Sequence, residues 1–159
     1  MGISKYMKIA DALAKKNLKT NHGGPFGAIV VKDGKIVGKG NNQVLKTNDP
    51  TAHAEIVAIR NACKKLKTYD LSGCKLYTSC YPCPMCLVAI IWSNIKVVYY
   101  GSTKEDAEEI GFRDDMMYDY LKDLTKGKQN EEILKLIDIN SDDTIFEAFK
   151  NKKDKTIYW

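Results

Sequence analysis

Three side chains of metal-binding type stand at the starts of two predicted helices, and they constrain the fold more than any other feature. His53 lies in the segment Thr-Ala-His-Ala-Glu (51–55), in the first turn of one helix. Cys83 and Cys86 lie where a predicted strand ends and the next helix starts. Cysteines three residues apart share a helix face, and the positive end of the helix dipole favours their thiolate forms. If one ion binds all three residues, the fold has to bring both helix starts together.

This donor set predicts a zinc site with one open position. Structural zinc sites usually have four protein ligands, whereas catalytic sites leave one position for water. Zinc lowers the pKa of bound water to about 7, which supplies hydroxide at neutral pH. Hydroxide can attack a ring carbon that carries an amino group, and Glu55 lies close enough to carry the proton to the departing ammonia. The residues therefore predict zinc-dependent hydrolytic deamination of a nitrogen heterocycle.

Two other metal-site interpretations involve residues near these motifs. Cys80 extends the cysteine pair to Cys-x-x-Cys-x-x-Cys, a spacing found at iron–sulfur clusters, but the fourth cysteine of that pattern is missing. Cys80 also ends a predicted strand, so a buried thiol is the better interpretation. His22 could complete a closed, structural zinc site, which would leave Glu55 without a role. A zinc-stabilised binding module without catalytic activity is the corresponding functional alternative.

Composition bounds the possible locations and partners. A chain of 159 residues with 44% hydrophobic and 28% charged residues is typical of one globular domain. The sequence has neither an apolar run long enough for a membrane helix nor a signal-peptide pattern, so we expect a cytoplasmic protein without membrane contact. Its five cysteines are an odd number, which favours free thiols and metal ligands over disulfides. Much of the net charge of +5 is scattered over predicted helix faces or lies in the tail 150–155, so we expect a solvated surface and no nucleic-acid partner.

The hydrophobic pattern alternates between helical and strand periods. Asp33-Gly34 between two apolar runs predicts a β-hairpin, and Asp49-Pro50 predicts a helix start. Helices and strands then alternate, which predicts later strands that are parallel and helices on both faces of the sheet. The expected fold is a single α/β domain over 1–159, a three-layer α/β/α sandwich with a mixed five-stranded sheet. The expected helices are 3–17, 49–62, 84–93, 104–110, 114–125 and 142–152, and the expected strands are 26–31, 35–40, 75–79, 95–100 and 133–139.

Several longer motifs carry a family resemblance. His-Ala-Glu followed by Pro-Cys-x-x-Cys is the signature of zinc nucleobase deaminases. The segments 24–34, 48–55, 77–80 and 82–86 together resemble the bacterial guanine deaminases of the cytidine deaminase superfamily. Gly111-Phe112, Asp114 and Tyr118 continue the resemblance, which covers roughly residues 20–153. It implies a cytidine deaminase-like fold, a zinc cofactor and hydrolysis of guanine to xanthine and ammonia.

The resemblance also implies roles for individual residues. Glu55 would be the general acid and base, and Asp114 a second acidic group near the leaving amine. Asn42 would hydrogen-bond the purine, Phe26 would stack on it, and the backbone around Ala54 and Cys83 would complete the pocket.

Each of these positions also has a structural interpretation. Asn42 follows a strand and could simply form a turn. Phe26 could belong to the core, and Asp114 could be a helix N-cap. Trp92 is a candidate wall of the pocket, although core packing is the better interpretation of its place on the 84–93 helix.

Enzymes of this kind resemble one another in forming homodimers whose C-terminal segments cover the partner's active site. Residues 142–159 are expected to form a C-terminal helix and tail of this type. Tyr158, in the aromatic end Ile157-Tyr158-Trp159, is the candidate lid residue, and a frayed terminus is the alternative.

Two departures from the family pattern bear on the substrate. Tyr81 replaces a glutamate next to the zinc cysteines, and Arg113 replaces an acidic residue beside Asp114. A tRNA adenosine deaminase is the nearest alternative, but the acidic segment 102–109 opposes phosphate binding. Cytosine or guanosine as substrate is a further alternative, because the size of the pocket depends on the lid.

Overall fold

The computed structural model describes residues 2–138 and 144–158 and divides into two compact units, Met1–Met116 and Met117–Trp159. The boundary falls inside helix α6 (Asp115–Leu124). The expected single domain over 1–159 stays a prediction. The second unit contains α7 (Thr144–Lys150). The first unit contains, in chain order, α1 (Ile3–Lys16), the 3-10 helix η1 (Asn17–Lys19), β1 (Gly27–Lys32), β2 (Lys35–Asn41), α2 (Val44–Thr47), α3 (Ala54–Leu66), β3 (Lys75–Cys80), α4 (Pro84–Trp92), β4 (Val97–Ser102) and α5 (Lys104–Glu109).

The sheet of the first unit confirms the mixed topology. Its strand order is β2-β1-β3-β4. β1 pairs antiparallel with both β2 and β3, whereas β3 and β4 are parallel, as the alternation of elements predicted. Asp33 and Gly34 both have positive φ, 47° and 72°, in the predicted hairpin turn between β1 and β2.

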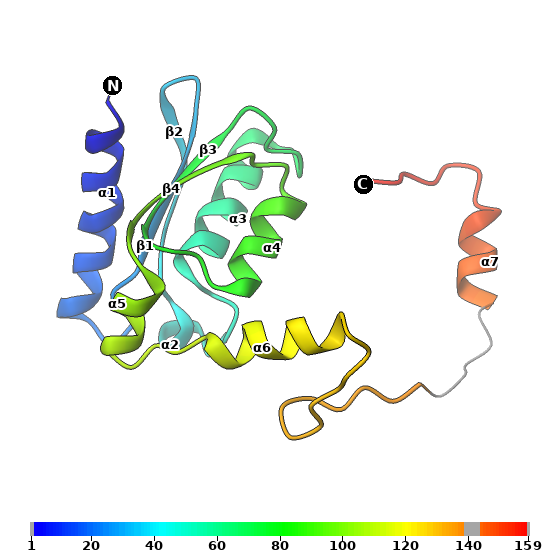
Figure 1. The fold of residues 1–159 in the computed structure, drawn as a ribbon. Coiled ribbons are helices and arrows are strands. Elements are labelled where there is room, and N and C mark those ends of the chain that lie inside the picture. Colours follow the sequence, from blue (N-terminus) through cyan, green and yellow to red (C-terminus); the bar gives the residue numbers. More distant parts are fainter. Residues whose placement is uncertain (1, 139–143, 159) are drawn as a thin grey trace. The chain divides into compact units, whose positions relative to one another are not determined.

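Helices cover both faces of this sheet, which confirms the three-layer α/β/α arrangement (Figure 1). Side chains of a strand alternate between faces. Ile29 and Val31 of β1 therefore pack with α1 in a cluster with Tyr6, whereas Ala28 and Val30 pack with α3 on the other face. Burial on both sides explains why β1 is almost continuously apolar.

Small residues let α3 lie directly against β2. Gly38 and Gly40 face the buried alanines 54, 58 and 62, all at 0% exposure. A Cβ atom on Gly40 would stand 2.2 Å from the carbonyl oxygen of Ala54, the first residue of α3. This close contact fixes the start of α3 on the sheet.

The predicted start of that helix at Asp49-Pro50 is wrong, because α3 begins at Ala54 with His53 as its N-cap. Asp49 instead closes a turn, in which its Oδ1 accepts hydrogen bonds from the Thr51 backbone N–H at 2.8 Å and from the Thr51 hydroxyl at 2.6 Å. An Asp side chain can accept from the backbone two residues later in a turn as well as at a helix start. The local sequence therefore did not distinguish the two structures.

The predicted fifth strand is also wrong for residues 133–138, and Ile139 lies outside the described residues. The sheet of the described chain has four strands. Residues 133–138 form a turn and irregular backbone, and Leu136 and Ile137 are 58% and 69% exposed. A strand needs a neighbour that takes up its backbone hydrogen bonds, and an apolar pattern alone does not supply one.

The predicted last helix is present as α7, Thr144–Lys150, while residues 142 and 143 lie outside the described part. Among the described residues, no helix combines the length and the apolar character of a membrane span.

Replacing Gly38 with alanine should destabilise the first unit. The new Cβ would meet the Ala58 carbonyl oxygen at 2.2 Å and the Ala62 nitrogen at 2.9 Å, both on the backbone of α3. We expect a loss of about 1–3 kcal/mol in the free energy of unfolding, measured by urea denaturation. Lys39→Ala, an exposed change on the same strand, should stay within about 0.5 kcal/mol of the parent. Equal stability of the Gly38→Ala variant and the parent would contradict the tight helix–sheet contact.

Candidate metal centre and active site

The structure brings the three predicted ligands together. The Nδ1 atom of His53 lies 3.5 Å from Cys83 Sγ and 3.7 Å from Cys86 Sγ. All three donor atoms lie within 4.8 Å of one another. With Zn–S bonds of about 2.3 Å and Zn–N bonds of about 2.05 Å, nitrogen and sulfur on a tetrahedral ion are about 3.6 Å apart. The spacing of these side chains therefore fits zinc.

Two helix starts position the ligands. His53 is the N-cap of α3 and Cys83 the N-cap of α4, in which Pro84 is the first helical residue. Within the described chain, neither side chain makes the hydrogen bond with which an N-cap residue usually satisfies its own helix. Both side chains are therefore available to a metal, and the positive ends of both helices favour negative charge there.

Hydrogen bonds within the ligand group set its protonation. Contact with the Cys86 thiol, and then with His53, lowers the pKa of Cys83 to about 4. Sharing that proton, together with burial, raises the pKa of Cys86, and contact with Cys83 raises the pKa of His53. One thiol of the pair is thus readily ionised, as a site for a soft cation requires.

Glu55 lies beside the ligand group and is only 6% exposed. Its Oε1 accepts a hydrogen bond of 3.0 Å from the Thr78 hydroxyl, and its Oε2 lies 3.5 Å from the Cys86 thiol, which donates to it. Burial is the main reason why the pKa of Glu55 is raised. A buried carboxyl that readily holds a proton suits a general acid and base.

Asp114 directly precedes α6, and its carboxyl is partly buried. Burial, followed by the negative charge of Cys83, raises the pKa of Asp114. Arg113 forms ion pairs with Asp115 at 2.9 Å and with Glu108 at 3.4 Å. The guanidinium group is thus engaged by two carboxylates on either side of Asp114 in the sequence.

Asn42 is buried and makes the predicted turn, since its Oδ1 accepts a hydrogen bond from the Val44 backbone N–H at 3.1 Å. Among the described residues, the Nδ2 atom of Asn42 has no hydrogen-bond acceptor. The turn therefore leaves this N–H group as a donor for a ligand. Ala54, fully buried, is the first residue of α3, where backbone N–H groups lack intrahelical acceptors.

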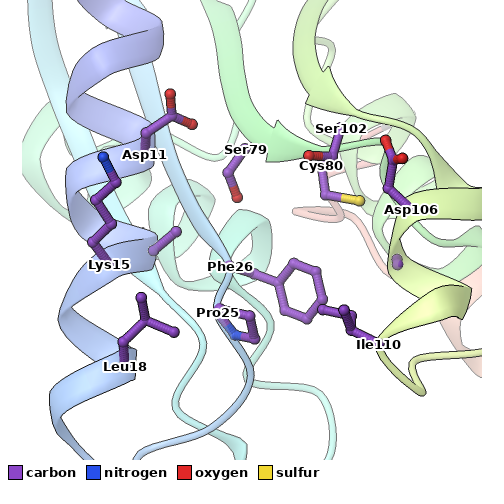
Figure 2. A pocket seen from close by; sticks show the side chains of 12 residues that line it. Asp11, Lys15, Leu18, Pro25, Phe26, Ser79, Cys80, Ser102, Asp106 and Ile110 are labelled. Atoms are coloured by element: carbon purple, nitrogen blue, oxygen red, sulfur yellow. The ribbon is translucent and has the colours of Figure 1, made fainter.

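Phe26 lines a pocket of about 340 Å³ beside α1 and α5, into which its ring points (Figure 2). The ring also meets Phe112 edge to face, with centroids 5.0 Å apart, and packs against the core between the sheet and α3. Residues of the metal group do not line this pocket. We therefore locate the chemistry at the ligand group, because among the described residues metal donors and a buried acid converge there.

Trp92 and Tyr158 are not brought to this group by the described contacts. Trp92 is the last residue of α4, whereas the zinc cysteines lie at the start of that helix. The side chain of Trp92 is 56% exposed, so the interpretation of Trp92 as a core residue is wrong. Tyr158 belongs to the second unit and is 67% exposed. Their roles toward substrate stay predictions.

Two buried polar residues escaped the sequence reasoning. Thr78 contacts Glu55, and its position on the α3-facing side of β3 could have indicated this, because a polar residue on a buried face needs a partner. Asn17 donates to the carbonyl oxygens of Gly24 and Asn42 at 2.7 and 2.8 Å, which ties the loop before β1 to the turn at Asn42. Nothing in the local pattern around Asn17 indicates that role.

The alternative metal sites find no support in the described residues. Cys80 is buried and donates to the Thr103 carbonyl oxygen at 3.3 Å, and burial raises the pKa of its thiol to about 11. His22 is not among the grouped metal-ligating side chains. Tyr81, the departure next to the zinc cysteines, packs edge to face on Tyr100 with centroids 5.1 Å apart.

Comparisons with known proteins agree with this site. Residues 2–102 match the model of the cytidine and deoxycytidylate deaminase zinc-binding region. The chain is 44% identical to the guanine deaminase of Bacillus subtilis, over 96% of this chain and 97% of that protein. The crystal structure of the Bacillus subtilis enzyme aligns with a TM-score of 0.92 at 42% identity and covers 100% of both chains. A tRNA-specific adenosine deaminase of Aquifex aeolicus is 42% identical over 64% of this chain and 67% of its own length.

Replacing Cys86 with serine should remove most of the bound zinc, because an alcohol is a far poorer zinc ligand than a thiolate. Zinc content per chain, measured by plasma mass spectrometry after dialysis, should fall several-fold below that of the parent. Cys80→Ser is the matched control, since Cys80 donates to a backbone carbonyl, and this variant should keep its zinc. Loss of zinc from the Cys80→Ser variant would instead identify a site with four protein ligands.

Proposed function

Because the chain belongs to the cytidine and deoxycytidylate deaminase family, we propose that it is a zinc-dependent guanine deaminase. The reaction consumes guanine and water and yields xanthine and ammonia. The observation that carries the proposal is the meeting of His53, Cys83 and Cys86 with the buried carboxyl of Glu55. The likeness to the Bacillus subtilis guanine deaminase supports guanine in particular, because it extends over nearly the whole chain.

His53, Cys83 and Cys86 would hold the zinc ion. When bound, zinc acts as a Lewis acid that lowers the pKa of water toward neutrality. Glu55 takes a proton from the attacking water and delivers it to the amino nitrogen, so that ammonia leaves as a neutral molecule. The raised pKa of Glu55 suits this role, because the group has to hold the proton between the two transfers.

Other residues would orient the purine. The Nδ2 atom of Asn42 offers a hydrogen-bond donor to an acceptor on the ring, and Phe26 offers an aromatic face. Asp114, also with a raised pKa, would supply a second acidic group toward the leaving amine. We propose these roles for the three residues together, because the Asn42 backbone N–H donates to the Phe26 carbonyl oxygen at 3.0 Å, the Phe26 ring meets Phe112, and Asp114 follows Phe112 by two positions.

Several observations favour a small substrate over tRNA. The likeness to the Aquifex aeolicus tRNA-specific adenosine deaminase covers 64% of this chain, less than the likeness to the guanine deaminase. Glu105, Asp106, Glu108 and Glu109 make α5 acidic, and four carboxylates repel phosphate groups.

We further propose a homodimer in which the C-terminal segments are exchanged between subunits. The second unit is short and exposes most of its large apolar side chains, as Ile145, Phe146 and Ile157, at 78%, 73% and 71%, illustrate. Many exposed apolar side chains on a small unit favour cover by another surface, which a second copy of the chain would provide. The cytoplasmic location expected from the sequence stays a prediction.

A side-by-side assay of ammonia release tests the proposed function. Guanine should be turned over faster than guanosine, cytosine, adenine or a tRNA anticodon stem-loop. Glu55→Gln should keep zinc but lower kcat roughly 10²- to 10⁴-fold, because the amide cannot take up the proton. A parent protein that binds zinc but releases no ammonia would support a non-catalytic binding module, and full activity of Glu55→Gln would contradict the proton transfer.

Removal of residues 154–159 tests the exchanged tail. If the tail covers the neighbouring site, kcat/KM for guanine should fall roughly 10-fold or more, because water is no longer excluded. Light scattering should report two chains of 17.9 kDa for the full-length protein. Lys153→Ala, an exposed change directly before the removed residues, should leave turnover at the parent value. Unchanged kinetics after truncation would show that the tail is a passive end.

A further inference from the structure

We propose that Thr78 is a positioning residue that assigns different tasks to the two oxygens of Glu55. This inference rests on the proposed deaminase function and deepens it. Thr78 would hold Oε1 in place by a hydrogen bond and leave Oε2 as the oxygen that takes up and releases the proton.

The first step of the argument is the fixed place of Thr78. It lies in β3, between β1 and β4, where its register partners are Ala28 and Tyr100. Its side chain is 1% exposed and points to the face of the sheet that α3 covers, as the contact with Glu55 shows. Threonine is branched at Cβ and has few rotamers, so a strand held on both sides presents its hydroxyl in one direction.

The second step is the asymmetry of the Glu55 carboxyl. Oε1 accepts from the Thr78 hydroxyl at 3.0 Å, whereas Oε2 lies 3.5 Å from Cys86 Sγ, on the side of the metal ligands. The two oxygens therefore have different neighbours before any substrate arrives. Through its contact with Cys86, Oε2 borders the group that would hold zinc and its water.

The third step is the effect of losing the hydrogen bond from Thr78 to Glu55. A glutamate side chain has three rotatable bonds, and burial leaves the Glu55 carboxyl little contact with solvent that could replace the Thr78 donor. Without the threonine hydroxyl, the carboxyl could rotate to find another donor and carry Oε2 away from the ligands. Proton transfer requires donor and acceptor within hydrogen-bond reach, so such a displacement slows the chemical step more than it weakens substrate binding.

Variants at Thr78 that differ by the hydroxyl test this inference. Thr78→Val removes the donor at nearly constant volume, and Thr78→Ser keeps it. Thr78→Ala compared with Thr78→Ser isolates the hydroxyl if the valine variant does not fold. Ser79→Ala is the matched control, because Ser79 lies on the same strand, accepts from the Gly27 backbone N–H at 3.0 Å and lines the pocket beside α1 (Figure 2).

Zinc content, kcat and KM for guanine are measured on each folded protein. We expect Thr78→Val and Thr78→Ala to keep their zinc and their KM within a few-fold, while kcat falls roughly 10- to 100-fold. Thr78→Ser should recover most of kcat, which a purely packing role of Thr78 would not predict, and Ser79→Ala should match the parent in kcat.

The outcomes separate this inference from the proposed function. Unchanged kcat in Thr78→Val and Thr78→Ala, with an active parent, would overturn the positioning role and leave the deaminase proposal intact. A fall in kcat that serine does not restore would also overturn it. A parent protein inactive toward every nucleobase would overturn the proposed function itself.

Discussion

Three soft donors that have to share one ion form the constraint on which the rest of the structure depends. His53 and the two cysteines start different helices, and their donor atoms come within 4.8 Å of one another. That meeting requires α3 to lie tightly on the sheet, which Gly38 and the alanines of α3 permit. It also requires α4 to start directly after β3, where Pro84 occupies the first helical position. Sheet packing and metal chemistry are thus two consequences of the same geometry.

The same geometry gives the acid its properties. Because Glu55 stands in the first turn of α3, the packing that places His53 also removes the carboxyl from water, and that burial raises its pKa. The positive helix ends and the neighbouring thiols both lie close to this buried carboxyl, where a charge is costly unless it is paired. In such a volume a single hydroxyl, that of Thr78, can decide how the carboxyl is oriented.

The sequence predicted the layers of the fold and the hairpin correctly, but it predicted one helix start and one strand wrongly. The apolar runs on either side of Asp33-Gly34 correspond to the observed strands β1 and β2 and their hairpin turn, because a hairpin arises from contacts between near neighbours. Asp49-Pro50 did not start a helix, since the aspartate formed a turn with Thr51 instead. The apolar run at 133–138 did not become a strand, since a strand depends on a partner that no local pattern can specify.

By itself, the sequence determined the chemical identity of the site: one imidazole, two thiols and a carboxyl, each next to a predicted helix start. These features depend on residue type and on spacing over a few positions, and both can be read directly from the sequence. Only the tertiary structure decided that Thr78 meets Glu55, that Asn17 ties down the turn at Asn42, and that Cys80 donates to the Thr103 carbonyl instead of binding metal. These contacts join residues more than twenty positions apart, and their existence depends on how the layers pack.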